Sequence, residues 1–393
     1  MRKQILLAAA LLLAFGTLHA QQKATVESFL GQHNYISTGM PILLIAPDGV
    51  ASAMGDAGAA STPDAYSTHW NNAKFAFVDN DLGISTTYTP WLRNLGVSDM
   101  NFLYLGAYKR INSRSTAAAS LTYFSLGELQ HTGEDGEDQG TFMPNEFAFD
   151  VSYAMKLSEY FSLGASGRFM RSDLTNGMDV EQQSTKAAKG LSADVGIYYQ
   201  QEVDKGQEVA AGLSITNLGS KLRYSDDNTQ AEFLPANLRI GGRYSYEIDN
   251  YNKITALLDF NKLLVPTPPY IDEDGEVYGR YESIVDYRQT GAMQGAIYSF
   301  FDAPGGFKEE LAEVSISAGA EYWYANTFAV RAGHFYEAKT KGGRQYATVG
   351  LGLKYNAFIF DFAYLIPTTN FNTNPLANTM RISLSVNFGK NKR

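Results

Sequence analysis

The sequence predicts an all-β membrane protein, a 14-stranded antiparallel barrel of the outer-membrane type. Three observations lead to this prediction. After residue 20 the chain has no run of about 18 apolar residues, so no helical membrane span is expected. Aromatic residues are abundant, with 25 Tyr and 23 Phe. From residue 82 onward, segments of alternating polar and apolar residues recur, which is the pattern of transmembrane β-strands.

Residues 1–20 have the features of a secretory signal peptide. Arg2 and Lys3 form a charged start, and the apolar residues 5–15 are too few to cross a bilayer as a helix. We expect residues 21–40 to form a polar lead-in on the periplasmic side. The chain has no cysteine, which excludes disulfides and cysteine-ligated metal. Its net charge of −9 argues against nucleic-acid binding.

Residues 41–80 differ from both the lead-in and the strands. They begin with an apolar run at Pro41 and become rich in Gly, Ala and Ser, so they fit neither a free tail nor another strand. We expect this segment to fill the barrel lumen as a plug, or hatch, with glycines making tight turns in a crowded space. The candidate plug residues are Gly55, Gly58, Trp70, Asn71, Asn72 and Ala73.

Residues 81–393 carry the predicted barrel. Its strands run about ten residues or more, the length that a tilted strand needs to cross a bilayer, whereas soluble strands are typically five or six residues long. Their even number is expected for a single-chain bacterial barrel. The predicted strands are residues 82–91, 100–110, 115–126, 146–157, 160–172, 190–201, 207–217, 236–247, 252–263, 313–324, 327–337, 344–355, 358–366 and 379–389.

Each strand should present an apolar face to lipid and a small, polar or charged face to the lumen. In residues 347–355, for example, Leu351 and Leu353 alternate with Gly350 and Gly352. Charged residues on the lumenal faces are expected to pair across the barrel interior. These are Asp194, Asp259, Glu321 and Asp361, with Arg239, Arg243, Lys354 and Arg381.

The connections alternate between short and long. Short ones fall at 111–114, 158–159, 202–206, 248–251, 325–326 and 356–357, and the longest ones are 127–145, 173–189, 218–235, 264–312 and 367–378. Short periplasmic turns opposite long outer loops are typical of outer-membrane barrels. This pattern predicts an outer-membrane location with both chain termini in the periplasm.

The 264–312 connection is the longest insertion, and it is predicted to carry a short helix at residues 291–302. Met293, Ile297, Phe300 and Phe301 fall on one face of that helix. Together with Tyr298 they could form an apolar pad for a partner chain. The alternative is a lid that packs onto the rim of its own barrel. Phe142 and Met143, in the 127–145 connection, are a smaller contact candidate.

Motifs of catalysis are absent from the sequence. It contains no H-E-x-x-H, no G-x-S-x-G and no P-loop. The acidic run at residues 134–138 lacks the ligand spacing of a calcium loop, so a solvated charge run is expected there. His69, next to Trp70, is expected to be structural. We therefore expect no enzymatic activity, no catalytic residues, no cofactor and no metal site.

Two short motifs suggest a family. Residues 70–74, Trp-Asn-Asn-Ala-Lys, resemble the Asn-Pro-Ala-like motif that ends the hatch in the FadL family of outer-membrane barrels, with Asn72 in place of the proline. Residues 53–59, Ala-Met-Gly-Asp-Ala-Gly-Ala, resemble its PorV (LptO) branch, which belongs to the type IX secretion system of Bacteroidetes.

That resemblance implies a role as a cargo shuttle. Such proteins receive cargo with a conserved C-terminal domain from a translocon barrel, called SprA or Sov. They pass it to the sortase PorU and the attachment complex, which joins it to anionic lipopolysaccharide. Two alternatives stay open. A FadL-type transporter of hydrophobic small molecules would need an apolar lumenal pocket, and a protein of lipid A or lipopolysaccharide deacylation would need a nucleophile and a base near the membrane rim.

Overall fold

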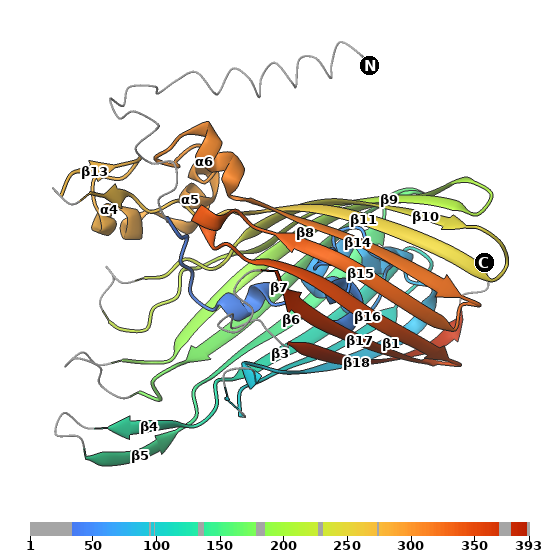
Figure 1. Ribbon diagram of the computed structural model, residues 1–393, viewed down its shortest axis with the longest axis horizontal. Helices are drawn as coiled ribbons and strands as arrows, with labels where there is room; N and C mark the ends of the chain where they lie inside the picture. The colour runs from blue at the N-terminus through green and yellow to red at the C-terminus, as the bar shows by residue number, and fades with distance from the viewer. Residues whose placement is uncertain are drawn as a thin grey trace, which may run out of the picture. The chain divides into compact units, whose positions relative to one another are not determined.

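In the computed structural model, the described part of the chain forms a closed barrel of fourteen antiparallel strands (Figure 1). The structure describes residues 34–93, 96–97, 99–132, 137–177, 185–226, 231–272, 275–368 and 379–390. The predicted signal peptide and most of the predicted lead-in lie outside these residues. Neighbouring strands in the sequence are neighbours in the barrel, and β1 closes it by pairing with β18.

Every predicted barrel strand is found, with ends that shift by at most three residues. Strands of ten residues or so form because β-branched, aromatic and small residues alternate along them. The barrel strands are β1 Asn80–Pro90, β2 Asn101–Arg110, β3 Ser115–Ser125, β6 Asn145–Lys156, β7 Phe161–Asp173, β8 Ala188–Asp204, β9 Gln207–Gly219, β10 Asn237–Glu247, β11 Asn252–Leu263, β14 Val314–Tyr324, β15 Phe328–Tyr336, β16 Gln345–Tyr355, β17 Phe358–Pro367 and β18 Met380–Lys390.

The two faces of the wall differ as the alternation predicts. In β7, Leu163 and Phe169 are exposed on the outer face, whereas Ser162 and Ser166 are buried on the inner face. The adjacent strand β8 repeats this pattern with exposed Ile197 and buried Asp194. Because successive side chains point to opposite faces of a strand, the apolar residues form an outer band and the polar residues line the lumen.

The two ends of the barrel carry different connections. We call the end with the short connections the turn end, and here Ala325 and Asn326 both adopt positive φ angles of 51° in the tight link between β14 and β15. The loop end carries the long connections. These contain the hairpins β4 Leu129–Thr132 with β5 Asp138–Phe142 and β12 Tyr270–Ile271 with β13 Val277–Tyr278, and the helices α4 Ile284–Gln289, α5 Ala292–Tyr298, α6 Phe307–Ala312 and η7 Lys339–Lys341.

None of the helices in the described ranges is long and apolar enough to cross a membrane.

The segment before β1 lies inside the barrel and follows its full length (blue in Figure 1). It contains the short helices η3 Pro41–Leu44, α2 Gly49–Ser52, α3 Ser67–Trp70 and η4 Asn72–Phe77. At the loop end, Asn34 Nδ2 donates to Pro268 O at 3.3 Å and Gly39 N donates to Phe233 O at 2.8 Å. At the turn end, the side chain of Arg110 donates to Val78 O. We call residues 41–78 the lumen segment.

This path corrects the expected position of the lead-in. Its described part, residues 34–40, lies at the loop end, whereas β18 ends at the turn end. Because the number of strands is even, β1 begins at the same end of the barrel at which β18 ends. The strand count does not say from which end the chain before β1 arrives. The chain before β1 crosses the lumen lengthwise, so its earlier residues emerge at the opposite end. The described part of the predicted periplasmic lead-in therefore lies at the end of the barrel opposite to the end of β18, whereas the two chain termini lie outside the described residues.

Candidate interaction site

The inner wall of the barrel is hollowed by glycines where the lumen segment touches it. A Cβ added to Gly164 would lie 2.5 Å from Ala73 N, and one added to Gly212 would lie 2.0 Å from Ala59 O. A Cβ on Gly333 would lie 2.2 Å from Gly55 N. Since no real Cβ contact is this short, only glycine lets the backbone of the segment approach these strands. Sequence reasoning did not single out these glycines, although several of them recur on the polar face of the alternation.

Trp70 ties the lumen segment to itself and to the wall. Its Nε1 donates to Asp48 Oδ1 at 2.7 Å, and the guanidinium of Arg239 lies over its ring at 4.7 Å. Ser214 Oγ donates to the Trp70 carbonyl at 2.9 Å. A Cβ on Gly58 would lie 2.1 Å from the indole, so Gly58 makes room for that ring.

Asn71, Asn72 and Ala73 dock on β7 and β8. Asn71 Nδ2 donates to Ile197 O at 3.0 Å, and its Oδ1 accepts from Ala73 N at 3.1 Å, which caps η4. Asn72 Nδ2 donates to Ser166 Oγ at 2.7 Å. On the other side of the lumen, Gly55 has a φ of 69° and donates through its N–H to Thr348 Oγ1 at 2.9 Å. The structure thus places all six predicted plug residues inside the barrel.

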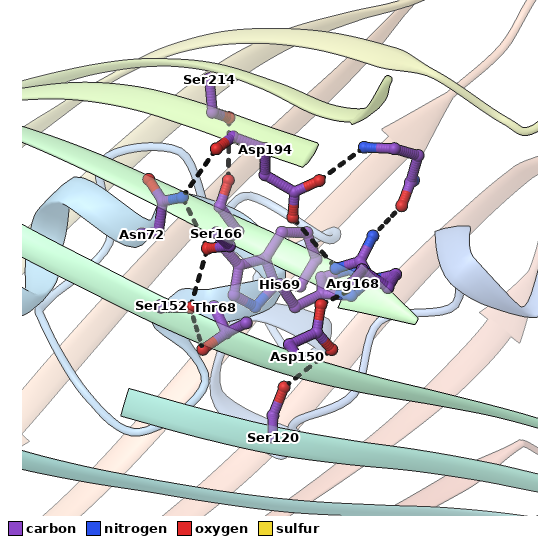
Figure 2. A network of polar contacts seen from close by, with 12 residues as sticks. Thr68, His69, Asn72, Ser120, Asp150, Ser152, Ser166, Arg168, Asp194 and Ser214 are labelled. Atoms are coloured by element: carbon purple, nitrogen blue, oxygen red, sulfur yellow. Dashed lines mark hydrogen bonds and ion pairs between the residues drawn. The ribbon is translucent and has the colours of Figure 1, made fainter. Parts of the chain in front are cut away.

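Figure 2 shows a polar network that joins this segment to the barrel wall. Arg168 bridges Asp150 at 2.6 Å and Asp194 at 3.0 Å. Ser120 Oγ donates to Asp150 at 3.0 Å, so the network spans β3, β6, β7 and β8. A second chain links Asn72 to Ser166, Ser152 and Thr68. Asp194 therefore pairs with Arg168, a residue that the sequence analysis did not name.

The other charged side chains in the lumen bind either charged partners on the barrel wall or the backbone of the lumen segment. Arg331 bridges Glu321 at 2.7 Å and Asp361 at 2.8 Å. Asp259 instead accepts from the N–H groups of Gly58 and Ala59, both at 2.7 Å. Arg381 Nε donates to Ala46 O at 3.0 Å. The sequence analysis predicted that lumenal charges pair with one another. It did not predict that some of them, such as Asp259 and Arg381, bind the backbone of the lumen segment instead.

Two cavities lie around the lumen segment. One of about 10 Å³ is lined by Ile42, Tyr104, Asp150 and Arg168 among others. The other, of about 400 Å³, lies at the loop end, with Tyr35, Trp70, Arg239, Glu337 and Arg344 in its lining. Both include charged side chains, so neither resembles an apolar pocket for a hydrocarbon.

The insertion between β11 and β14 is anchored at the loop end by a buried ion network. Lys262 Nζ lies 3.0 Å from Glu310 and 2.6 Å from Glu313. Lys341 Nζ lies 2.9 Å from Glu313, which also accepts from Thr267 Oγ1 at 2.6 Å. The insertion, the connection between β15 and β16, and the end of β11 thus meet at Glu313.

Asp302 lies next to this network. Its Oδ2 accepts from Thr267 N at 3.2 Å. Burial, together with the neighbouring carboxylates of Glu310 and Glu313, raises the pKa of Asp302 to about 8. A buried carboxyl with a raised pKa thus accepts a hydrogen bond from the start of the insertion.

The insertion also has an apolar core of its own. Phe233 from the β9–β10 connection packs with Val265, Tyr281 and Tyr287, and Ile36 lies against this cluster. A Cβ on Gly295 of α5 would lie 2.9 Å from Pro266, so the small-residue face of α5 packs closely on the start of the insertion. The helices are therefore fixed in place rather than free.

The opposite side of α5 and the turn that follows the helix carry the predicted apolar residues, and these are exposed. The exposed fractions are 60% for Met293, 57% for Ile297, 49% for Phe300 and 57% for Phe301. We call these four residues the apolar face. Ala296, on the other side of α5, packs with Ala236 and Leu264 at the barrel rim. The lid alternative therefore holds for the helix itself, but not for these four side chains, which point away from the rim. Tyr298 is half-buried beneath the guanidinium of Arg280, at 3.4 Å.

The helix itself is shorter than predicted. It ends at Tyr298, and Phe300 and Phe301 follow in a turn in which Phe301 N donates to Tyr298 O at 2.9 Å. Phe307 and Leu311 on α6, 81% and 62% exposed, were missed because their i, i+4 spacing is too brief a pattern. Phe142, at the end of β5, is half-buried, whereas Met143 is exposed.

A sequence model of one protein family, described as "Type IX secretion system protein PorV", matches residues 29–270. The chain belongs to the PorV family. The matched region contains the lumen segment and strands β1 to β11, and it ends at the start of the insertion. The helices α4, α5 and α6 lie beyond it, so their role has to be argued from their own geometry.

Solved structures show the same fold. The toluene transporter TodX of Pseudomonas putida aligns with a TM-score of 0.52 at 12% identity, covering 91% of this chain and 100% of TodX. A deltaS2 mutant of TodX, a monoaromatic hydrocarbon channel, gives a TM-score of 0.51 at 12% identity, covering 86% and 98%. At this identity the likeness shows the FadL-like barrel fold alone. No match was found among curated proteins. This PorV-family chain is thus an outer-membrane barrel of the type IX secretion kind.

Proposed function

We propose that this protein captures secreted cargo bearing a conserved C-terminal domain as it leaves the translocon barrel, SprA or Sov. It then shuttles the cargo to the sortase PorU and the attachment complex at the cell surface. In this proposal the loop end faces the exterior and the turn end faces the periplasm. The observation that carries the proposal is the apolar face, four large side chains exposed on α5 and on the turn that follows it.

The apolar face has the properties of a protein-binding surface. Large apolar side chains exposed together favour burial by a partner, and aromatic residues and Met are common at such contacts. The ion network around Glu313 and the core around Phe233 hold α5 before any partner arrives. Such preorganisation lowers the entropy cost of binding. This supports capture of a protein chain rather than of a small solute.

The filled lumen supports a barrel that does not conduct. The lumen segment is bonded to strands around the barrel, including β7 through Asn72, β11 through Asp259 and β16 through Gly55. A transporter of hydrophobic molecules would have to displace these contacts or route its substrate around them. We propose that the segment acts as a plug and that the protein has no enzymatic activity.

The test is affinity purification of the tagged protein from its native outer membrane, followed by mass spectrometry. We expect secreted proteins that share a C-terminal domain, together with the translocon barrel and attachment-complex proteins. Lipids extracted from the same sample should show no enriched fatty acid. Enriched fatty acids or hydrocarbons without secreted proteins would contradict the shuttle and favour a transporter.

A further inference from the structure

Four basic residues line a recess at the loop end of strands β7 and β8. Arg171 lies near the end of β7, Lys189 lies at the start of β8, and Lys186 and Arg223 lie in the neighbouring connections. The recess has a volume of about 540 Å³. Ala187 completes the lining. We call these four residues the basic recess.

Regular backbone pairing brings the four side chains together. Arg171 and Lys189 are direct cross-strand partners in the barrel. The connection before β8 then pairs with the connection after β9, because Thr185 bridges Ser225 and Lys186 N donates to Tyr224 O at 2.8 Å. This pairing places Arg223 beside the strand ends. The recess is therefore a folded feature of the wall and not a chance meeting of loose side chains.

The recess lies directly beyond the apolar band of the outer wall. On β7 and β8 the outward-facing pair next to Arg171 and Lys189 is Phe169 with Leu191, which are 40% and 66% exposed. Exposed Leu163 and Ile197 pair further along the same outer face, toward the turn end. Because apolar residues on this face meet acyl chains, the next residues outward lie at the depth of lipid headgroups.

The charge balance of the recess is positive although the whole chain carries a net charge of −9. Arg171 bridges Asp173 at 2.6 Å, and Lys186 pairs with exposed Asp226. Among the described residues of the recess, four cations thus face two carboxylates. Arg side chains bind phosphate through paired N–H groups, and Lys adds a compact charge. This composition suits a ligand with more than one phosphate.

We propose that the basic recess binds the phosphate groups of a phosphorylated glycolipid in the outer leaflet, with its acyl chains against Phe169 and Leu191. The inference rests on the orientation in the proposed function, in which the loop end faces outward. It adds a lipid site on the outside of the barrel, separate from the apolar face on α5. A bound lipid there would fix the depth of the barrel and support the β7–β8 and β9–β10 connections.

A lipid fits better than an acidic protein segment because of where the recess lies. Arg171 and Lys189 are the last outward-facing pair of β7 and β8, and the adjoining surface is the lipid-facing Phe169 and Leu191. One amphiphilic lipid can place its phosphates in the basic recess and its acyl chains on the apolar surface below it. An acidic peptide would bind the basic recess only. Surface Lys and Arg side chains are attracted to anionic lipid headgroups, so four of them close together should strengthen binding jointly.

The test is native mass spectrometry of the full-length protein, released from nanodiscs that contain bis-phosphorylated lipid A or the same lipid without phosphates. The variant carries Arg171→Gln, Lys186→Gln, Lys189→Gln and Arg223→Gln. We expect retention of the phosphorylated lipid by the wild-type protein, little retention of the dephosphorylated lipid, and about tenfold or greater loss in the variant. Added inorganic phosphate should compete only weakly, since it lacks the acyl chains.

A matched control removes four charges at the turn end, through Lys109→Gln, Arg114→Gln, Lys205→Gln and Lys253→Gln, and should retain the lipid. Equal retention by both variants, or equal binding of the lipid without phosphates, would overturn the site. So would full displacement by inorganic phosphate or by an acidic peptide. The outcome is independent of secretion, because cargo capture by the recess variant is measured separately. Loss of lipid with normal capture would uphold both proposals.

Discussion

Trp70 Nε1 donates a hydrogen bond of 2.7 Å to Oδ1 of Asp48, across 22 residues of the lumen segment. The other oxygen of that carboxylate accepts from Ala51 N at 2.7 Å and caps α2. Both partners are almost completely buried. One carboxylate thus joins α2 to the indole at the end of α3. The fold of the segment inside the barrel depends on this link.

Asp48→Ala should loosen the lumen segment without unfolding the barrel. It leaves the indole N–H and the first turn of α2 unsatisfied, at a cost of about 1–3 kcal/mol for each buried group. We expect a measurable conductance in planar bilayers and a larger one after deletion of residues 41–74. Asp249→Ala, which removes an exposed carboxylate at the turn end, is the control and should stay silent. A silent deletion variant would mean that the segment is not a plug.

Gly164 and Gly167 on β7 give a matched pair for testing close contact with the wall. A Cβ on Gly164 would meet Ala73 N at 2.5 Å, whereas nothing lies within 4 Å of a Cβ on Gly167. Gly164→Val should therefore displace η4 at a cost of about 1–3 kcal/mol or more. Heat-modifiability in gels and bilayer conductance measure the effect. Gly167→Val should match the wild-type protein, and similar behaviour of the two variants would contradict the glycine argument.

Replacing Met293, Ile297, Phe300 and Phe301 with Ser should weaken capture of cargo or translocon by about tenfold or more, since buried aromatic anchors carry much of the energy of an interface. The barrel should stay intact because these side chains are exposed and lie in the insertion, outside the barrel wall. Quantitative co-purification measures the loss. A variant with Leu at all four positions keeps the apolar surface and should retain most binding. Unchanged co-purification of the Ser variant would remove the apolar face from the proposal.

The stability of the insertion should depend on pH through Asp302. Burial raises the pKa of Asp302 from 3.8 to about 8 in the folded insertion. Between these values the folded state holds a proton that the unfolded state has released, so the free energy of unfolding falls as pH rises toward 8. Lys262, Glu310, Glu313 and Tyr281 are the neighbouring titratable groups.

Hydrogen exchange of α6, corrected for its intrinsic pH dependence, measures this effect between pH 6 and pH 9. Protection should decline in the wild-type protein and stay nearly level in Asp302→Asn, which remains uncharged throughout. Asp286→Asn, at an exposed position on α4, is the control and should behave like the wild-type protein. Equal pH dependence in Asp302→Asn and the wild-type protein would assign the effect to Glu310 instead.

The barrel wall could be predicted from the sequence because its signal is local. A period of two, broken by short turns, fixes which residues of β7 or β16 face outward and which connections are long. The apolar face could likewise be predicted from one short stretch of helical spacing around Ile297. Such features need no knowledge of distant residues.

The interior could not be predicted in the same way, because its partners come from distant parts of the chain. The two carboxylates that bind Arg168 lie on the adjacent strands β6 and β8, and nothing in the alternation marks an arginine as their shared partner. Asp259 binds two backbone N–H groups about 200 residues earlier, which no side-chain pattern can indicate. The direction in which the lumen segment crosses the barrel is also a property of the packed state.

That direction leads to the sharpest test of topology. The chain has no native cysteine, so a single introduced cysteine can be labelled without background. Ser37 is exposed and lies at the loop end with the contacts of Asn34 and Gly39, whereas exposed Glu159 lies in a connection at the turn end. A membrane-impermeant maleimide added to intact cells should label Ser37→Cys but not Glu159→Cys. Both should react after lysis. Labelling of Glu159→Cys alone in intact cells would reverse the proposed orientation, and protection of both would place residues 34–40 away from the outer surface.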